Sequence, residues 1–131
     1  ALNTGHDGSL STGHANSPKD MISRLETMVL MGMNLPLPAI ERQIASGLDI
    51  IVHLGRLRDK SRKVLEVTEV LGYWDGQIHL QTIYRYEEIR KEDENVTENE
   101  KKDQESKVHG EWKKVAELFH REKLVAAGYY I

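Results

Sequence analysis

The sequence predicts an α/β fold, in which a mixed sheet with a β-hairpin is flanked by helices. Two capped runs repeat apolar residues at helical spacing, and three other runs are rich in the β-branched and aromatic residues typical of strands. The expected helices are 18–32 and 38–46, and the expected strands are 48–57, 63–73 and 77–86. Trp74-Asp75-Gly76 separates the last two strands, and Asp-Gly favours a tight hairpin turn.

The first helix has a clear start and end in the sequence. Ser17 can cap the helix, Pro18 suits its first position, and Asp20 lies three residues after the cap, as in a capping box. Gly32 is placed to end this helix in the left-handed conformation. The second helix is expected to stop at Gly47.

The first of these strands, 48–57, contains three consecutive β-branched residues, Ile50, Ile51 and Val52. A continuous run of this kind suits a strand that is buried on both faces. The next strand, 63–73, and its hairpin partner, 77–86, follow a short loop that is rich in positive charge.

The segment 87–107 is a charge run, because 14 of its 21 residues are Asp, Glu, Lys or Arg. Such a composition buries little apolar surface, so we expect a mobile linker or a long solvated loop; a solvated helix face is the alternative. The remaining segment, 108–131, is predicted to be amphipathic. Its helix should include Leu118 and Val125 and end near Gly128.

Composition excludes several classes of protein. The 18 Lys and Arg residues against 21 Asp and Glu give a net charge of −3, which argues against a nucleic-acid binder. The absence of cysteine rules out a disulfide scaffold and a cysteine nucleophile, and agrees with a cytosolic protein. No apolar run approaches about 20 residues, so we expect no membrane insertion. The chain lacks an initiator Met, and we expect it to be part of a longer protein.

The most informative segment is 3–17, which holds two histidines and five hydroxyl residues directly before the first helix. We expect a strand at 8–13, which places His14, Asn16 and Ser17 at its carboxyl end, where α/β sheets bind ligands. The alternative is that His14 only caps or packs against the helix.

Neither a metal site nor a nucleophile elbow is predicted here. If residues 8–13 are extended, His6 and His14 lie about 26 Å apart at roughly 3.3 Å per residue, which is too far for both to bind one ion. The sequence contains no G-x-S-x-G, and no phosphate-binding G-x-x-x-x-G-K-[ST].

The segment 3–17 resembles the histidine box of the secretion and pilus-assembly ATPases. The likeness is to the CpaF-like branch that drives tight-adherence (Flp-type) pili. The pattern of that branch is approximately N-T-G-H-x-G-S-x-x-T-x-H-A-N-S followed by R-L-E-T-M, which stands here at 24–28. The resemblance continues through Gln43-Ile44-Ala45-Ser46, Asp49-Ile50-Ile51-Val52, Leu57-Arg58-Asp59 and Val67-Thr68-Glu69-Val70. It covers 1–86 strongly and 108–130 weakly.

This resemblance implies that 1–86 is the C-terminal half of a RecA-like ATPase core. It implies a homo-hexamer that uses ATP and Mg, lies on the cytoplasmic side of a bacterial inner membrane and contacts pilus or secretion platform proteins there. In the family, the histidine box follows the Walker A and Walker B motifs, which are not found in this sequence. We therefore expect this chain alone to be inactive, with no tightly bound cofactor.

The resemblance also assigns roles to residues. His14 matches the second histidine of the box and is expected near the γ-phosphate of ATP. His6 matches the first histidine and is expected to be structural first and indirectly catalytic second. Thr12 and Ser11 match the hydroxyl positions between them, and strand alternation would place Thr12 on the face of His14 and Ser11 on the other.

Three arginines of the loop, Arg56, Arg58 and Arg62, are possible contacts to a neighbouring subunit, although plain solvated charges are the favoured interpretation. A non-enzymatic oligomerisation or docking module, in which the polar box merely caps a helix, is the competing function.

Overall fold

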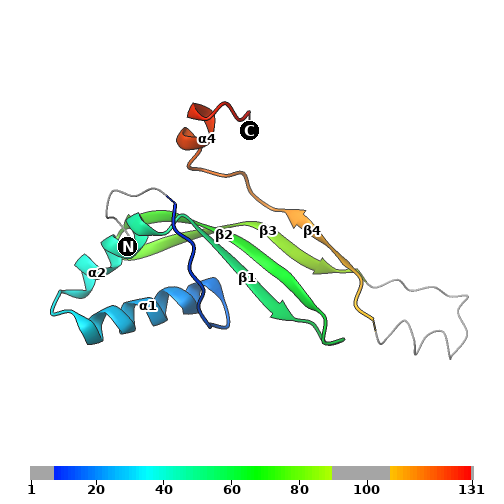
Figure 1. The fold of residues 1–131 in the computed structure, drawn as a ribbon, viewed down its shortest axis with the longest axis horizontal. Coiled ribbons are helices and arrows are strands. Elements are labelled where there is room, and N and C mark those ends of the chain that lie inside the picture. Colours follow the sequence, from blue (N-terminus) through cyan, green and yellow to red (C-terminus); the bar gives the residue numbers. More distant parts are fainter. Residues whose placement is uncertain (1–7, 90–106, 131) are drawn as a thin grey trace, which may run out of the picture.

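The computed structural model describes residues 8–89 and 107–130, in which two helices lie beside a sheet (Figure 1). The elements are α1 (Pro18–Gly32), α2 (Leu37–Gly47), β1 (Ile50–Arg56), β2 (Arg62–Trp74), β3 (Gln77–Glu88), β4 (Gly110–Lys114) and α4 (Glu122–Ala126). The predicted α/β class, the hairpin and the flanking helices are confirmed.

The sheet has the strand order β1-β2-β3-β4, and all of its pairings are antiparallel. A mixed sheet was predicted, but the described residues contain no parallel pair. The reason is that β1, β2 and β3 follow one another through short connections, and a short connection reverses the chain. The β2–β3 turn is as predicted, because Asp75 and Gly76 have φ of 52° and 75°, the positive values that a type I′ turn requires.

Replacing Gly76 tests this turn. An added Cβ at Gly76 would have no atom within 4 Å, so Gly76→Ala introduces backbone strain without a collision. We expect the free energy of unfolding to fall by about 1 kcal/mol, the typical cost of holding an L-residue in the left-handed region. Chemical denaturation of the two proteins measures the difference. An unchanged midpoint would show that the turn does not constrain the hairpin.

The two long helices form where the sequence places them. Ser17 caps α1, with its Oγ accepting the N–H of Asp20 at 3.1 Å. The expectation for Gly32 is wrong, since Gly32 is helical and α1 ends in an extended Met33 whose N–H donates to the Val29 carbonyl. A left-handed residue is not needed there because the chain continues extended towards α2.

The core lies between the helices and one face of the sheet. Ile22, Ile40 and Ile44 are buried, and Ile40 has no exposed surface. Half-buried apolar residues from both helices, their connections and the sheet pack against them, namely Leu25, Val29, Leu35, Leu48, Ile51, Ile78 and Leu80. The helices are therefore held on the face of the sheet to which Ile51 points.

Two acidic residues meet in the contact between the helices, Glu26 of α1 and Glu41 of α2. Burial raises the pKa of Glu26, and the nearby Glu41 carboxylate raises it further. The ionised form of Glu26 is thus less stable in the folded chain than in the unfolded one. Stability from this site is present at acidic pH and is lost as pH rises through the raised pKa.

Glu26→Gln should therefore stabilise the protein at pH 7. We expect a gain of at most about 0.5 kcal/mol, because Glu26 is half-buried rather than buried. At a pH below the ordinary glutamate range, where both states are protonated, the two proteins should have equal melting temperatures. A variant that is less stable at pH 7 would contradict the proposed repulsion.

The strand β1 differs from its prediction in burial. It was expected to be buried on both faces, but Ile50, Val52 and Leu54 are 42%, 50% and 63% exposed. Only the alternate residues, including Ile51, face the helices. The reason is that β1 is an edge strand of the described sheet and no described element covers its second face.

The C-terminal part of the chain departs most from the prediction. The strand β3 continues to Glu88, and the Ile89 N–H donates to the His109 carbonyl, so the charge run begins as sheet. Residues 90–106, the rest of the predicted linker, lie outside the described residues. The strand β4 was not predicted, and the last helix is only Glu122–Ala126, which excludes Leu118.

A buried carboxylate fastens the C-terminal segment to the second face of the sheet. Glu69 is opposite Ile50 in the β1–β2 ladder, so its side chain points away from the helices. Glu69 is 1% exposed, and its two oxygens accept the N–H groups of Phe119 and His120 at 2.8 and 2.9 Å. These bonds hold the segment between β4 and α4 against β2.

Candidate functional site

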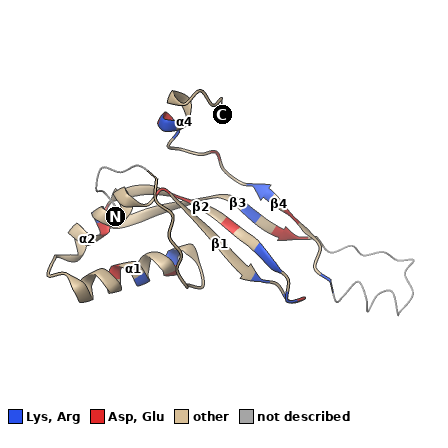
Figure 2. Ribbon diagram, viewed as in Figure 1, with Lys and Arg blue, Asp and Glu red and all other residues tan. Residues whose placement is uncertain are grey.

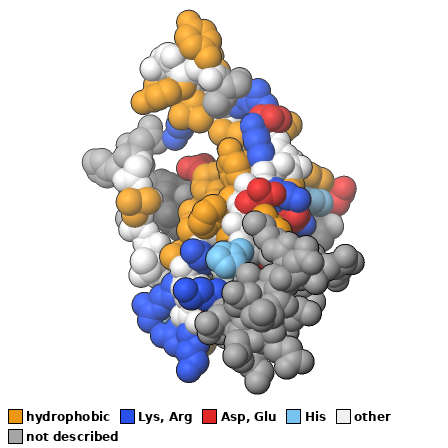
Figure 3. Space-filling model, turned by 90° about the vertical axis from the view of Figure 1, so that its right-hand side faces the viewer, with side chains coloured by type: hydrophobic (Ala, Val, Ile, Leu, Met, Phe, Trp, Pro, Cys, Tyr) orange, Lys and Arg blue, Asp and Glu red, His pale blue; other side chains and the backbone are white. Residues whose placement is uncertain are grey.

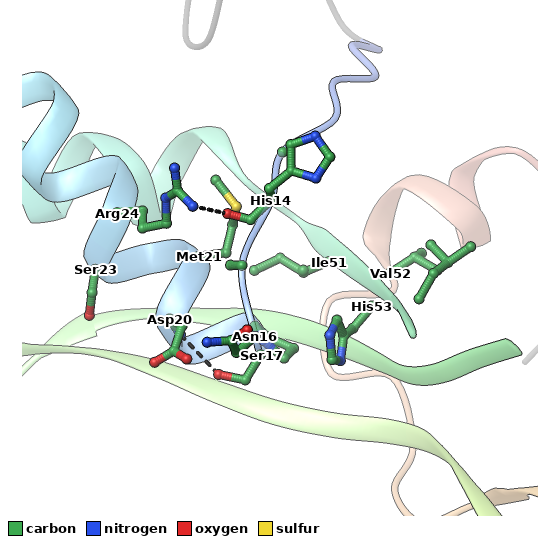
Figure 4. Close-up of a pocket in the computed structure, with 14 residues that line it drawn as sticks. His14, Asn16, Ser17, Asp20, Met21, Ser23, Arg24, Ile51, Val52 and His53 are labelled. Atoms are coloured by element: carbon green, nitrogen blue, oxygen red, sulfur yellow. Dashed lines mark hydrogen bonds between the residues drawn. The ribbon is translucent and has the colours of Figure 1, made fainter. Parts of the chain in front are cut away.

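A pocket of about 780 Å³ lies between the polar segment, the start of α1 and β1 (Figure 4). The polar segment contributes residues 13–17, α1 contributes its first two turns, and β1 contributes residues 51–54. The lining residues are Gly13, His14, Ala15, Asn16, Ser17, Pro18, Asp20, Met21, Ser23, Arg24, Ile51, Val52, His53 and Leu54. The pocket therefore lies beside His14, Asn16 and Ser17, the residues at which the sequence predicted a ligand site.

His14 lines this pocket, and a hydrogen bond to its backbone carbonyl, not to its imidazole ring, holds it in place. Arg24 of α1 donates from Nη1 to the His14 carbonyl at 2.5 Å, and the side chain of His14 is exposed. In Figure 4 the ring of His14 points away from Arg24. The imidazole is thus accessible to a ligand, while the backbone of His14 is held by Arg24.

The strand predicted at 8–13 is absent, because residues 8–15 have no regular secondary structure. No described strand pairs with this segment, and its glycines and small polar residues have little tendency to form a strand alone. The alternation that placed Thr12 beside His14 therefore has no basis in the structure. Ser11 and Thr12 are exposed and do not line the pocket, and His6 lies outside the described residues.

His53 and Arg24 line the pocket but were not predicted as site residues. His53 is half-buried on β1 and contributes a second imidazole to the pocket. A signal for it exists in the sequence, because it is the single polar residue in the apolar run from Ile50 to Leu54. Arg24 gave no such signal, since an arginine on an amphipathic helix is ordinarily solvated.

The polar side chains of the pocket are mostly hydrogen-bond donors. The side chains of His14, Asn16, Arg24 and His53 can all donate, whereas Asp20 is the only acid among the described lining residues. The start of α1 adds the positive end of a helix dipole. The pocket is consequently suited to an anionic ligand.

Replacing Ser17 tests the structural role of the polar segment, which is to cap α1, separately from any role in binding a ligand. Ser17→Ala removes the hydroxyl that caps α1, so we expect the free energy of unfolding to fall by about 1 kcal/mol. Thermal unfolding of the wild type and the variant measures the loss. Unchanged stability would mean that the cap bond does not hold in solution.

The three loop arginines are all exposed, but they differ in their contacts. Arg58 donates from Nε and Nη2 to Oε1 of Glu88, at 3.1 and 2.6 Å. This bond ties the β1–β2 connection to the end of β3. Arg56 and Arg62 end β1 and begin β2, and they lie opposite one another in the ladder.

Two kinds of feature are not found in residues 8–89 and 107–130. No three His, Asp or Glu side chains gather there in a way that could hold a metal ion. Among the same residues, no helix is both long and apolar enough to cross a membrane.

Comparison with known proteins places this chain among secretion proteins. Residues 1–120 match the family described as "Type II/IV secretion system protein". Two proteins of Mycobacterium tuberculosis are each 33% identical over 84 residues, which is 64% of this chain and 23% of theirs. They are named "Putative conjugal transfer protein MT3759" (strain CDC 1551 / Oshkosh) and "Putative conjugal transfer protein Rv3659c" (strain ATCC 25618 / H37Rv).

The family match covers more than half of the chain, including the pocket and all four strands. The chain spans about a quarter of the length of the curated relatives that it matches. The sequence, the fold and the comparison agree, and the protein belongs to the type II/IV secretion system protein family.

Proposed function

We propose that this chain is part of a hexameric ATPase that powers pilus assembly or protein secretion by hydrolysing ATP with Mg²⁺. The observation that carries the proposal is the family match over residues 1–120, which includes the histidine box at 3–17. Pilus assembly is the finer assignment, and it rests on the CpaF-like pattern of that box and on R-L-E-T-M at 24–28.

The pocket supports a role in nucleotide chemistry. Its donors match the oxygens of a phosphate group, and phosphoryl transfer depends on positioning and charge stabilisation more than on covalent chemistry. His14 has an exposed ring on an anchored backbone, so it can donate to a γ-phosphate oxygen or orient the attacking water. Mg²⁺ would supply charge neutralisation between the phosphates.

The proposal gives the other residues of the histidine box indirect roles. Ser11 and Thr12 are exposed beside the pocket without lining it, so a role in catalysis requires that the segment rearranges in the whole protein. His6 keeps its proposed structural role. Arg58 contacts Glu88 within the chain, and the side chains of Arg56 and Arg62 are exposed.

The proposed place of action is the cytoplasmic side of the inner membrane, against platform proteins of a pilus or secretion system. The proposal includes no membrane insertion and no nucleic acid. A hexamer would bring several such pockets into one ring.

An oligomerisation or docking module without enzymatic activity is the second candidate. The observation that favours it is that the polar segment already has structural contacts, since Ser17 caps α1 and Arg24 binds the His14 carbonyl. In that case the segment would fix the start of α1 and nothing else.

The test uses the full-length protein and the bacterium that encodes it. We expect the purified protein to release phosphate from Mg-ATP, and deletion of its gene to abolish surface pili or export of a secreted protein. Loss of pili on deletion, without phosphate release by the protein, would support the docking module instead. If the protein releases phosphate but the deletion strain has normal pili and normal export, the protein is an ATPase and the proposed role in pilus assembly or secretion is wrong.

A further inference from the structure

Two arginines face one another where β1 meets β2. The ladder pairs Arg56 directly with Arg62, and the preceding pair is Gly55 with Lys63. Residues directly opposite in an antiparallel ladder point to the same side, with Cβ atoms about 5 Å apart. Like charges in this position are destabilising, so the ladder places two positively charged side chains on one side of the sheet despite their repulsion.

The connection between them is fixed. Asp59 accepts hydrogen bonds from the Ser61 N–H and the Ser61 hydroxyl through Oδ1, and from the Val108 N–H through Oδ2. These bonds, the Ser61 hydroxyl first, lower the pKa of Asp59 to about 2. Within the turn, the Leu57 N–H donates to the Ser61 carbonyl. The register of the two arginines is therefore enforced by the turn and by the lead-in to β4.

The positive charge here is not balanced by the described part of the chain. The segment 56–63 holds five cations and one acid, a net of 5 − 1 = +4. Glu88 pairs with Arg58, which leaves +3. Across residues 8–89 and 107–130, neither Arg56 nor Arg62 is in an ion pair, and Figure 3 shows Lys and Arg side chains gathered at this end of the molecule.

We propose that Arg56 and Arg62 form a clamp for a phosphate group, distinct from the pocket at His14. Both side chains are exposed at the strand ends, where blue segments of β1 and β2 meet the loop (Figure 2). Two planar guanidinium groups offer paired N–H donors that match the oxygens of one phosphate. A bound phosphate would replace the repulsion between the arginines by two attractions.

The charge of the site favours phosphate over carboxylate. A phosphate monoester carries about −1.5 to −2 at pH 7, which matches two guanidinium groups, whereas one carboxylate carries only −1. Lys60, whose φ is 66°, lies in the turn and adds to the field, whereas Lys63 is the second residue of β2 and its Nζ lies 6.0 Å from the centroid of the Trp112 ring. The ligand can be a soluble phosphate monoester or a lipid whose headgroup is a phosphate monoester, since both present this chemistry.

The test titrates the protein with inorganic phosphate at low ionic strength and follows the Nε–Hε signals of the arginines by NMR. We expect saturable shifts at Arg56 and Arg62, and about tenfold weaker binding for both Arg56→Gln and Arg62→Gln. Arg56→Lys keeps the charge but loses the paired donors, so its binding should also be weaker than that of the wild type.

Lys19→Gln is the matched control, because it removes one exposed positive charge from α1, at the pocket end of the helix. It should change phosphate binding less than twofold. If phosphate affinity falls equally in Lys19→Gln and Arg56→Gln, the protein attracts phosphate only through its overall positive charge and the clamp is wrong. Binding that does not saturate would lead to the same conclusion.

Vesicles distinguish the source of the phosphate. Phosphatidic acid vesicles, which expose a phosphate monoester, would assign the clamp to lipid headgroups if they sediment the wild type but not Arg56→Gln, with no effect of phosphatidylcholine. Phosphate binding without vesicle binding would assign it to soluble phosphate compounds. Vesicle binding that is equal in the wild type and both variants, without phosphate binding, would overturn the proposal. None of these outcomes depends on whether the protein hydrolyses ATP.

Discussion

In the full-length protein, His14→Ala is expected to lower ATP turnover about 100-fold while changing ATP affinity only a few-fold. The structure leaves the His14 ring exposed at a pocket of donors, where it can act on the phosphate or on the attacking water. Losing one polar group that is positioned to stabilise a transition state typically costs about 3 kcal/mol, which corresponds to a fall in rate of about 100-fold. Steady-state phosphate release and equilibrium binding of a nucleotide measure the two quantities.

Ser17→Ala is the control for this experiment, because it weakens the same segment without removing the imidazole. It should lower the melting temperature and leave turnover near normal at low temperature. If His14→Ala behaves in the same way, with reduced stability and wild-type turnover, the catalytic role of His14 is wrong and the capping interpretation holds.

Glu69→Ala is expected to release the C-terminal segment from the sheet. The substitution leaves the N–H groups of Phe119 and His120 without their acceptor, and hydrogen bonds to a charged group contribute about 1.5–3 kcal/mol. We expect the free energy of local opening of this segment to fall by about 3 kcal/mol. Amide hydrogen exchange should become faster at Phe119 and His120 and remain unchanged in α1.

Gln81→Ala is the matched control on the same face of the sheet. Gln81 donates a neutral hydrogen bond to the Glu117 carbonyl at 2.7 Å, so its removal should cost about 1 kcal/mol. Equal exchange rates in Glu69→Ala and the wild type would show that the segment is held by other contacts.

The sequence was most informative where local chemistry decides the structure. The Ser17 cap, the Asp75-Gly76 turn and the apolar spacing of the two helices each depend on neighbouring residues only, and each is confirmed. A pocket lies beside His14, where a ligand site was predicted, but the strand at 8–13 from which that prediction followed is absent.

The sequence was least informative where a distant partner decides the structure. The strand β4 has the sequence Gly-Glu-Trp-Lys-Lys, without apolar alternation, and its place depends on pairing with β3. Its lysines are typical of an edge strand. The burial of β1 and the conformation of residues 8–15 likewise depend on what lies beside them, which periodicity cannot indicate.

The site shows the same division. His14 lies in a recognisable pattern, whereas His53 comes from a strand about forty residues later and reaches the pocket only because the sheet packs under α1. The ion pair of Arg58 could not be predicted either. Its partner, Glu88, lies beyond the predicted end of the strand, and the pair forms because β3 extends to that residue.

The way β4 joins the sheet has a consequence for assembly. Its five paired positions on β3, and the contact of Val108 with Asp59, join strand edges and backbone groups that every copy of the chain carries. A β4 strand from a second copy of the chain can therefore make the same bonds. At high protein concentration, domain-swapped dimers would retain every contact of the monomer, and the length of the intervening segment would set how readily they form.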